Sequence, residues 1–356
     1  MTIRRRAFSA LLPAALWSAF AKNSFAQEIF ISDTHSHSNM TRQYFDRCFE
    51  CELTASKVSL VSWAAVADGP FIARNANGGI QVNFKASPKE YQDTFLRQIF
   101  NMQSRIFKEN LKIARTADDI DRALKGEIHI VLSTEGAHYL GGELRFLNLA
   151  YNKGIRQIGL GHFVEGDILD VRTEPAKLGG LSEFGRAVIQ RCNALGILID
   201  LAHSNENSAS QALQTSSQPM LWSHSNITAS PFIFENTKPH KTMMSLGLDN
   251  AKILASKGGV IGIWPSRSDF DTPDAYIDGL QAATSMVGVD HVAFGTDMQG
   301  LSTQATMMTD YSGMRDIVNR MLAKNMPEAV VRKVASENYG RLLKTVFNGR
   351  TAPDPM

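Results

Sequence analysis

The sequence is poor in cysteine and has no long basic segment. Three cysteines in 356 residues are too few for a disulfide scaffold. A net charge of +2, with no basic run beyond the first six residues, gives no reason to expect nucleic acid as a partner. Low-complexity tracts and clear internal repeats are also lacking. With 44% hydrophobic residues, the chain can instead bury a substantial globular core.

Residues 1–26 have the pattern of a cleavable export signal. A positive segment at Arg4–Arg6 precedes a largely apolar stretch at Ala10–Phe20, and Ser24–Ala26 offers a small-x-small cleavage site. The apolar stretch is too short, and is interrupted by Pro13, to form a permanent membrane span. We therefore expect the mature protein to start near Gln27.

The segment Arg5-Arg6-Ala7-Phe8 resembles the twin-arginine signal of a bacterial export route for folded proteins. An ordinary secretory signal that is rich in arginine is the alternative. Both predict a periplasmic or secreted protein, and folded export would suit a protein that loads a metal before it leaves the cytoplasm.

Cys48 and Cys51 form a Cys-x-x-Cys pair, which could be a zinc half-site, a redox pair or a local disulfide. No second cysteine pair completes a zinc ribbon, and no thioredoxin-like context surrounds this one. These absences favour a structural role.

Eight short apolar runs predict parallel strands that are covered on both faces. They are Ile29–Ser32, Ser59–Val66, Ile128–Ser133, Arg156–Leu160, Ile197–Leu201, Met220–Ser223, Val260–Trp264 and His291–Phe294. The segments that predict helices are Lys89–Ala114, Leu144–Asn152, Glu183–Leu195, Asp249–Ser256, Tyr276–Met286, Tyr311–Lys324 and Glu328–Thr345. The alternation predicts one domain over residues 27–350, a (β/α)8 TIM-like barrel with its active site at the carboxyl ends of the strands.

A doubly wound open sheet is the main rival to the barrel, but no Gly-rich phosphate loop marks a nucleotide site. The stretch from Phe71 to Thr94 is long, and we expect it to carry a lid or substrate loop.

Polar side chains follow six of the eight predicted strands. The strand ends read Asp33-Thr34-His35-Ser36-His37, Ser133-Thr134-Glu135-Gly136, Gly161-His162, Asp200-Leu201-Ala202-His203, Ser223-His224-Ser225 and Gly295-Thr296-Asp297. In a barrel these ends share one rim, so their side chains should converge. A single histidine after a strand is more often structural, which is our interpretation of His129, His138, His240 and His291.

The converging histidines and glutamate predict a two-metal site. His35 and His37 lie two residues apart on a strand, so both can face the barrel mouth and bind one cation. His203 and His224 can bind a second, and Glu135 can bridge the two ions. Imidazole ligands with little carboxylate favour zinc. Two such ions could hold a hydroxide that attacks an amide, ester or related bond.

Asp297 and His162 are the candidates for proton transfer and for stabilising charge in the reaction. Asp297 could accept a proton from the attacking water and pass it to the leaving amine. Capping of its own turn is the structural alternative. His162 could stabilise the oxyanion of the tetrahedral intermediate, or be a satisfied core histidine.

The order and context of these residues resemble the membrane (renal) dipeptidase family of zinc metallopeptidases, within the wider amidohydrolase group. The resemblance covers residues 31–347 and is carried by Asp33–His37, Glu135-Gly136, Leu198–His203, Ser223–Ser225 and Gly288–Asp297, with further matches at Gly180–Gly185 and Gly258–Ile261. It implies a zinc-dependent TIM-like barrel that cleaves dipeptides, including some with a D-residue at the C-terminal side.

The resemblance also implies roles for single residues. His35 and residue 37 would bind one zinc, Glu135 would bridge, and His203 and His224 would bind the other. His162 would contact the substrate carbonyl, and Asp297 would be the acid/base residue.

The chain departs from the family pattern at two places. The family has Asp where this chain has His37, and losing one negative charge should weaken metal binding. The family also has an Arg after the last histidine ligand, which binds the dipeptide carboxylate through two parallel N–H···O hydrogen bonds. Here Lys238–Ser245 contains no Arg. Lys238 or Lys241 could contact the carboxylate, but only as a point charge.

These observations favour an exported dipeptidase-like hydrolase that acts on a small-molecule or dipeptide substrate. Two alternatives remain: hydrolysis of another small amide, ester or lactone, and a metal-retaining or peptide-binding homologue without catalysis. Intact Glu135 and Asp297 argue against the last. The sequence leaves open whether the protein forms a homodimer.

Overall fold

The computed structural model describes residues 28–38, 40, 46–74, 80–84, 86–229 and 244–355. The predicted export signal at residues 1–26 lies outside this part of the chain, as do His240, Lys238 and Lys241. No helix within the described ranges is both long and apolar enough to cross a bilayer.

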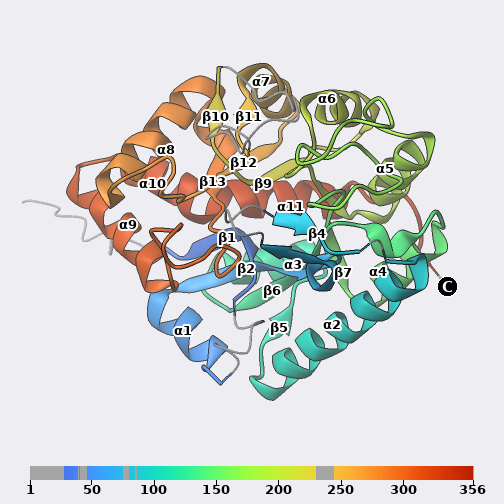
Figure 1. The fold of residues 1–356 in the computed structure, drawn as a ribbon. Helices are drawn as coiled ribbons and strands as arrows, with labels where there is room; N and C mark the ends of the chain where they lie inside the picture. The colour runs from blue at the N-terminus through green and yellow to red at the C-terminus, as the bar shows by residue number, and fades with distance from the viewer. Residues whose placement is uncertain are drawn as a thin grey trace, which may run out of the picture.

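Parallel strands form the centre of the fold (Figure 1). Among the described residues, eight of them are hydrogen-bonded in sequence: β1 (Ile31–Ser36), β2 (Val58–Val66), β6 (His129–Glu135), β7 (Ile155–Gly159), β8 (Leu198–Asp200), β9 (Leu221–Ser225), β12 (Val260–Ile263) and β13 (Val292–Phe294). All eight correspond to the predicted runs, with bounds that differ by at most four residues. Short strands accompany them: β5 (Lys112–Ile113) extends the sheet beside β6, β3 (Ile72–Arg74) pairs with β4 (Ile80–Val82), and β10 (Ile227–Thr228) pairs with β11 (Leu246–Gly247).

Backbone hydrogen bonds between the first and last strands bring the sheet round into a barrel. The N–H of His37 donates to the carbonyl of Met298 at 2.9 Å, and the N–H of Asp297 donates to the carbonyl of His35 at 3.0 Å. The predicted (β/α)8 architecture is therefore confirmed. Because these bonds join the strand ends at the mouth, they also fix Asp297 beside the two histidines of β1.

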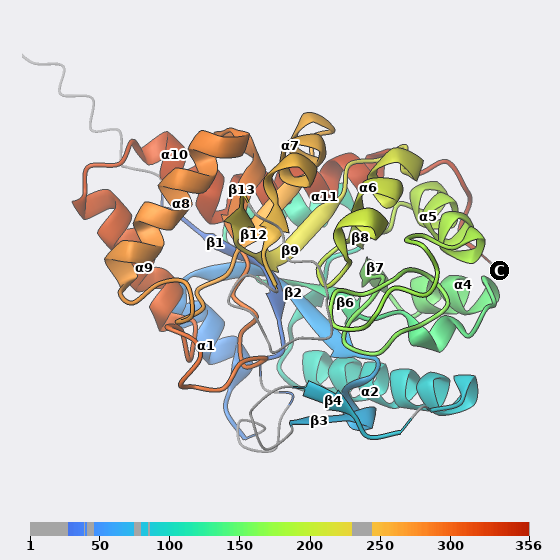
Figure 2. The same cartoon turned by 45° about the horizontal axis from the view of Figure 1, so that its top comes forward.

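Helices surround the barrel, as Figure 2 shows from a second direction. They are α1 (Phe49–Ser56), α2 (Pro88–Lys108), α3 (Ala117–Ala123), α4 (Arg145–Asn152), α5 (Glu183–Leu195), α6 (Glu206–Thr215), α7 (Leu248–Ser256), α8 (Pro273–Val287), α9 (Ser312–Ala323), α10 (Glu328–Arg332) and α11 (Asn338–Asn348). Local signals start several of them. At α2, for example, Ser87 and Glu90 form a reciprocal capping box and Pro88 occupies the first turn.

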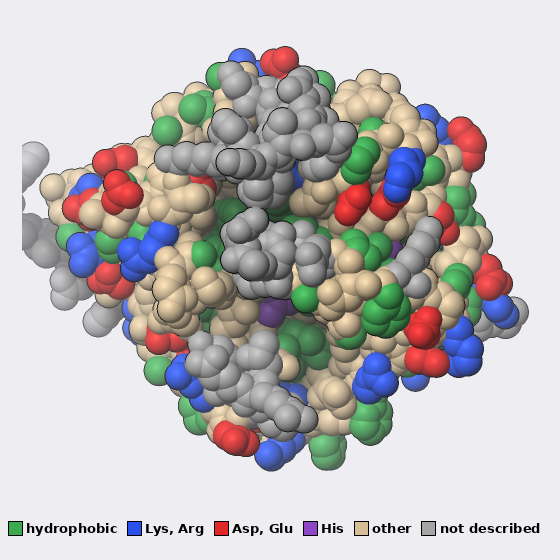
Figure 3. Space-filling model, viewed as in Figure 1, with side chains coloured by type: hydrophobic (Ala, Val, Ile, Leu, Met, Phe, Trp, Pro, Cys, Tyr) green, Lys and Arg blue, Asp and Glu red, His purple; other side chains and the backbone are tan. Residues whose placement is uncertain are grey.

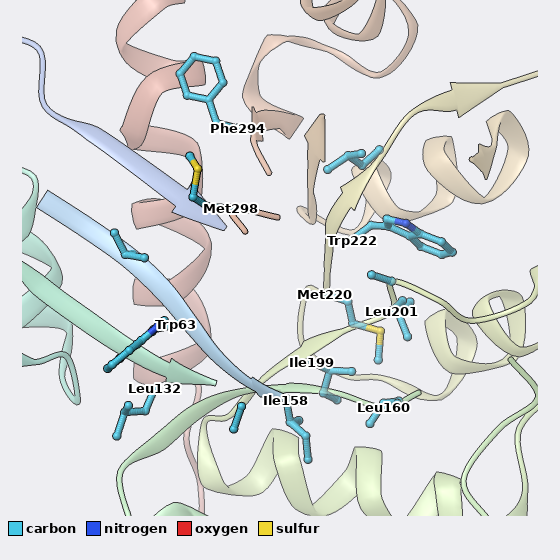
Figure 4. Close-up of a cluster of buried hydrophobic side chains, with 14 of the residues drawn as sticks. Trp63, Leu132, Ile158, Leu160, Ile199, Leu201, Met220, Trp222, Phe294 and Met298 are labelled. Atoms are coloured by element: carbon cyan, nitrogen blue, oxygen red, sulfur yellow. The ribbon is translucent and has the colours of Figure 1, made fainter. Parts of the chain in front are cut away.

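Two apolar clusters hold the layers together. One fills the barrel with side chains such as Leu60, Val131 and Leu198. Helix α11 packs against this cluster with Leu342 and Leu343. The second lies between the strands and the surrounding helices. Figure 4 shows part of this second cluster, with Trp63, Leu132, Ile158, Ile199 and Trp222 among its labelled members. Strands such as β8 and β9 thus contribute apolar side chains to both clusters, which explains why their runs do not alternate.

Some predicted element bounds were wrong. The helix expected over Lys89–Ala114 ends at Lys108, because Asn110 turns the chain with a positive φ of 54° and Lys112–Ile113 then pairs with β6. The helix expected over Glu328–Thr345 is interrupted by a π-helical turn at Lys333–Glu337. Helices α1, α3 and α6 had not been predicted. The expected loop at Phe71–Thr94 contains β3, β4 and the start of α2.

Cys48 and Cys51 form a disulfide. Cys48 is also the N-cap of α1, where its sulfur accepts from the N–H of Cys51. The next residue, Phe49, packs its ring 5.2 Å from that of Trp63 and 6.3 Å from that of Tyr311. The pair therefore has a structural place at the start of a helix that packs on the barrel. The third cysteine, Cys192, is buried and unpaired.

Candidate metal centre at the barrel mouth

Five predicted ligands meet at the carboxyl ends of the strands. His35 lies in β1, Glu135 ends β6 and His224 lies in β9, whereas His37 and His203 lie just beyond β1 and β8. All five are buried, with exposed fractions between 1% and 6%. In Figure 3, histidine is visible at the floor of a hollow near the centre of the face. The convergence inferred from strand ends is therefore present in the fold.

Glu135 is at the centre of the cluster. Its Oε1 lies 3.3 Å from Nε2 of His35 and 2.9 Å from Nε2 of His203. Its Oε2 lies 3.3 Å from Nε2 of His37. The carboxylate therefore faces both pairs of imidazoles, which is the position that a bridging ligand requires.

The ligand atoms have the spacing of a metal centre. Nε2 of His35 and Nε2 of His37 are 3.0 Å apart, and the same distance separates the Nε2 atoms of His203 and His224. Two nitrogens bound at about 2.0–2.1 Å to one tetrahedral ion would lie roughly 3.3 Å apart. Glu135 completes each pair into a group whose ligand atoms all lie within 4.8 Å of one another. The donor set fits two divalent ions.

Second nitrogens of two rings are held by protein acceptors. Nδ1 of His37 lies 3.1 Å from the carbonyl of Ala64, and Nδ1 of His224 lies 2.8 Å from Oγ of Ser223. Such contacts fix the ring orientation and direct Nε2 toward the ion. His203 is set by its backbone instead, which has a positive φ of 70° that few non-glycine residues adopt.

Electrostatics within the cluster differ between the two pairs. Burial and the neighbouring imidazoles lower the pKa of His224 well below its usual value. Burial also lowers the pKa of His203, so both rings are neutral, as metal ligands must be. Burial also acts to lower the pKa of His37, but hydrogen bonds to Asp297 and Glu135 outweigh it and raise this pKa to about 10. Without a metal, His37 is therefore an imidazolium.

Asp297 and His162 flank the five ligands. Oδ1 of Asp297 lies 3.3 Å from Nε2 of His37, and Nε2 of His162 lies 3.2 Å from Oε2 of Glu135. Asp297 has a positive φ of 49°. A Cβ at Gly300 would come within 1.9 Å of its Oδ1, so a larger residue there would displace the carboxylate. Both residues predicted for proton and charge handling thus face the mouth.

Sequence reasoning missed two side chains at the mouth, on the two strands to which it assigned no polar end. Asp68 follows β2 and is fully buried, with its carboxylate bonded to Nδ1 of His162. Trp264 follows β12, and its ring centroid lies 6.0 Å from that of His224. The only available signal was position, since each stands one or two residues past a strand end.

The remaining predicted residues lie elsewhere. His129, His138 and His291 each bond a backbone carbonyl, that of Glu127, Val164 and Gly259 respectively, and are not among the ligand groups. Lys238 and Lys241, expected near the substrate carboxylate, lie outside the described residues, so their predicted role remains a prediction.

Comparisons with known proteins identify related sequences and folds. The membrane dipeptidase family (peptidase family M19) matches residues 10–352. Dipeptidase tcpJ of Claviceps purpurea is 28% identical over 265 residues, which are 72% of this chain and 60% of that protein. The chain thus spans less than two thirds of that relative's length.

Solved structures share the fold. The probable dipeptidase PvdM from Pseudomonas aeruginosa superposes with a TM-score of 0.75 at 17% identity, over 90% of this chain and 96% of that one. A metallopeptidase from Rhodobacter sphaeroides, bound to a phosphinate mimic of L-Ala-D-Ala, superposes with a TM-score of 0.73 at 19% identity, over 89% of this chain and 99% of that one.

Proposed function

The chain belongs to the membrane dipeptidase family, and from this membership and the geometry of the mouth we propose that it is an exported hydrolase of dipeptides with a two-metal centre. The observation that carries the proposal is the position of Glu135 between the imidazole pairs His35–His37 and His203–His224. A carboxylate buried among four imidazoles is not needed for stability, because apolar residues of similar volume would stabilise the fold as well or better. Its presence therefore points to a function.

The donor set supports zinc, since four nitrogens and one carboxylate suit a borderline cation better than magnesium or calcium. His35, His37 and Glu135 would hold one ion, and Glu135, His203 and His224 the other. Two divalent ions bound there would supply Lewis acidity toward the scissile carbonyl and would lower the pKa of a water molecule at the centre.

Asp297 is suited to move protons. Its carboxylate lies beside the ligand cluster and is largely buried with it, at an exposed fraction of 8%. In the proposed reaction it accepts a proton from the attacking water and returns it to the leaving amine, as a positioned carboxylate can.

His162 is suited to hold the substrate carbonyl oxygen. Burial acts to lower its pKa, but the charges of Asp68 and Glu135 outweigh it and raise this pKa, which favours the ring form with a proton on both nitrogens. A donor placed in a water-poor mouth stabilises the negative charge that develops on the oxygen in the transition state.

The test is a panel of dipeptides with L- and D-residues at the C-terminal side, assayed with purified zinc-loaded protein and elemental analysis. We expect hydrolysis by the parent protein. Asp297→Asn should keep its metal but lose at least about a hundredfold in kcat. Loaded protein that cleaves no member of the panel would contradict the proposal.

A second candidate keeps the same centre but acts on another small amide, ester or lactone. It is favoured by the absence of Arg from Lys238–Ser245, because a dipeptide presents a free carboxylate that such an Arg would grip. N-acylated amino acids and small lactones in the same assay separate the two candidates.

Export rests on the sequence of residues 1–26, and the Cys48–Cys51 disulfide supports it, since such bonds persist in oxidising compartments. The route is tested by fractionating bacteria that express the full chain. We expect the protein in the periplasm or medium, and we expect Arg5→Lys together with Arg6→Lys to retain it in the cytoplasm if the twin-arginine route is used.

A further inference from the structure

Asp68 is a buried carboxylate with an unusually complete set of hydrogen-bond donors. Its exposed fraction is 0%. One oxygen, Oδ1, accepts from Nδ1 of His162. The other, Oδ2, accepts from the backbone N–H groups of Phe163 at 3.2 Å and Val164 at 2.9 Å. A buried carboxylate is costly unless it is satisfied in this way, so its partners indicate its purpose.

All three donors belong to the segment that carries His162 away from β7. Oδ2 holds the backbone just after His162, and Oδ1 holds the ring itself. The imidazole is thereby fixed at both its backbone and its far side. Nε2 is left as the nitrogen that faces the mouth, 3.2 Å from Oε2 of Glu135.

An ionised carboxylate can only accept, so the proton on this contact stays on Nδ1 of His162. A carboxylate behind a histidine sets the ring rotation and holds a proton on the nitrogen that faces it. We propose that Asp68 is a positioning residue, which acts through His162 to direct its Nε2 at the substrate carbonyl. This inference rests on the proposed role of His162 in hydrolysis.

A purely structural role for Asp68 is the competing explanation, in which the carboxylate only caps the loop at Phe163 and Val164. The two explanations can be separated because one oxygen of Asp68 contacts the ring of His162 and the other contacts the two backbone N–H groups. In Asp68→Asn the amide oxygen can still accept from the two backbone N–H groups, which require an acceptor. The amide NH2 then faces Nδ1 and cannot accept its proton.

The first experiment does not depend on activity. Histidine ring resonances of the zinc-loaded, nitrogen-15-labelled protein should include a downfield Nδ1–H signal that disappears in His162→Ala, which assigns it. We expect the same signal to be lost in Asp68→Asn while thermal unfolding and zinc content stay near those of the parent. Persistence of the signal in Asp68→Asn would overturn the proposal.

The second experiment uses the dipeptide on which the parent enzyme is most active. We expect Asp68→Asn to lower kcat by about 10–100-fold, the usual loss when the partner of a functional histidine is removed. KM should change little. In a His162→Ala background the same substitution should have no further effect, because Asp68 acts only through that ring. Additive losses would assign Asp68 a structural role instead.

The two experiments also separate this inference from the proposed function. If no dipeptide is cleaved by the parent protein, the proposed substrate fails, but the ring signal still reports whether Asp68 fixes His162. Asp68→Ala serves as the control for loop capping. It leaves the N–H groups of Phe163 and Val164 unpaired, so it should lower the unfolding temperature where Asp68→Asn does not.

Discussion

Nε2 of His37 lies 3.3 Å from Oδ1 of Asp297, so a proposed metal ligand and the proposed acid/base residue are in direct contact. Related proteins have Asp at the position of His37, as the resemblance to the family indicates. The exchange replaces a negative ligand by a neutral one beside Asp297. It therefore bears on how firmly the centre holds its ions.

We expect His37→Asp to increase metal retention. One added negative charge at contact distance is worth ~1–4 kcal/mol toward a cation in surroundings between water and a protein surface, so the affinity should rise by about fivefold or more. Zinc remaining after dialysis against a weak chelator measures this. His37→Asn is the matched control, since it removes the imidazole without adding charge and should retain less metal than the parent. Equal zinc contents in His37→Asp and the parent would contradict the argument.

Metal uptake should depend strongly on pH because His37 must lose a proton to bind. Burial opposes its protonation, but hydrogen bonds to Asp297 and Glu135 raise its pKa to about 10 in the metal-free protein. The deprotonation of His37 alone should therefore raise the apparent zinc affinity by about tenfold per pH unit, up to a pH of about 10. Zinc titrations from pH 7 to 9 measure the slope, and His37→Asp should show a smaller one.

The same group predicts how stability depends on pH in the metal-free protein. The folded-state pKa of His37 is raised from 6.5 to about 10. Its contribution to the free energy of unfolding is therefore fully present below about pH 6.5 and is lost as pH rises to about 10. Chemical denaturation of chelated protein at pH 6.5, 8 and 10 should show a decline that His37→Asn lacks. A flat profile in both proteins would indicate that His37 is not charged.

Strand-end reasoning predicted the barrel and the convergence of the candidate ligands because both depend on local patterns. An apolar run followed by a polar residue is visible in sequence, and a closed parallel sheet brings such ends together whatever the loop lengths. His35 and Glu135, a hundred residues apart, could therefore be placed at one mouth. The order of His203 and His224 on neighbouring strands followed for the same reason.

The role of Asp68 could not be predicted in this way, because it depends on a contact with a residue that is distant in the sequence. In sequence it is an aspartate before Gly69-Pro70, which is typical of a turn. Only the fold brings it to His162, 94 residues away. The π-helical turn at Lys333–Glu337 was not predicted either, and Asn338, which follows it, donates to the carbonyls of Val289 and Val292.

Arg172 clamps the segment that carries His203. Its N–H donates to the carbonyl of His203 at 2.9 Å, and its guanidinium donates to the carbonyls of Ser204 and Ser245. Arg172→Lys loses the fork that reaches both carbonyls, so we expect the free energy of unfolding to fall by about 1–3 kcal/mol in urea titrations. Arg186→Lys, at a partly exposed site on α5, is the control and should change it by less than about 0.5 kcal/mol.

Asp33 is a buried carboxylate near the candidate metal centre, and substitutions there test whether its negative charge contributes to the stability of the fold. Burial raises its pKa to about 7, although the N–H and hydroxyl of Thr296 and the N–H of His35 bond it. A raised carboxyl pKa means that stability falls as pH rises from about 4 to 7. In metal-free protein at pH 8, Asp33→Asn should therefore be at least as stable as the parent. Asp33→Ala should be less stable by about 1–3 kcal/mol, because it leaves N–H groups unpaired. A large loss in both variants would contradict this.

Trp264 borders the candidate metal centre, and we expect it to contact the substrate. Its indole N–H has no hydrogen-bond acceptor among the described residues, and its ring lies beside His224 at the mouth. Buried donors in native proteins are nearly always satisfied, so a ligand oxygen is the expected partner. We expect Trp264→Phe to raise KM by about 2–12-fold, the value of one neutral hydrogen bond, with kcat nearly unchanged.

Trp222 provides the matched control for Trp264, since its indole N–H also lacks an acceptor within the described part of the chain. Trp222 lies on the outer side of β9 (Figure 4), where Arg172 packs over its ring at 5.1 Å. Trp222→Phe should thus lower the unfolding temperature and leave KM alone. Trp264→Phe should instead raise KM and leave the unfolding temperature nearly unchanged, because its ring borders the candidate metal centre rather than the helix layer. If Trp264→Phe lowered the unfolding temperature without changing KM, its indole would be a packing residue and the substrate oxygen would bind elsewhere.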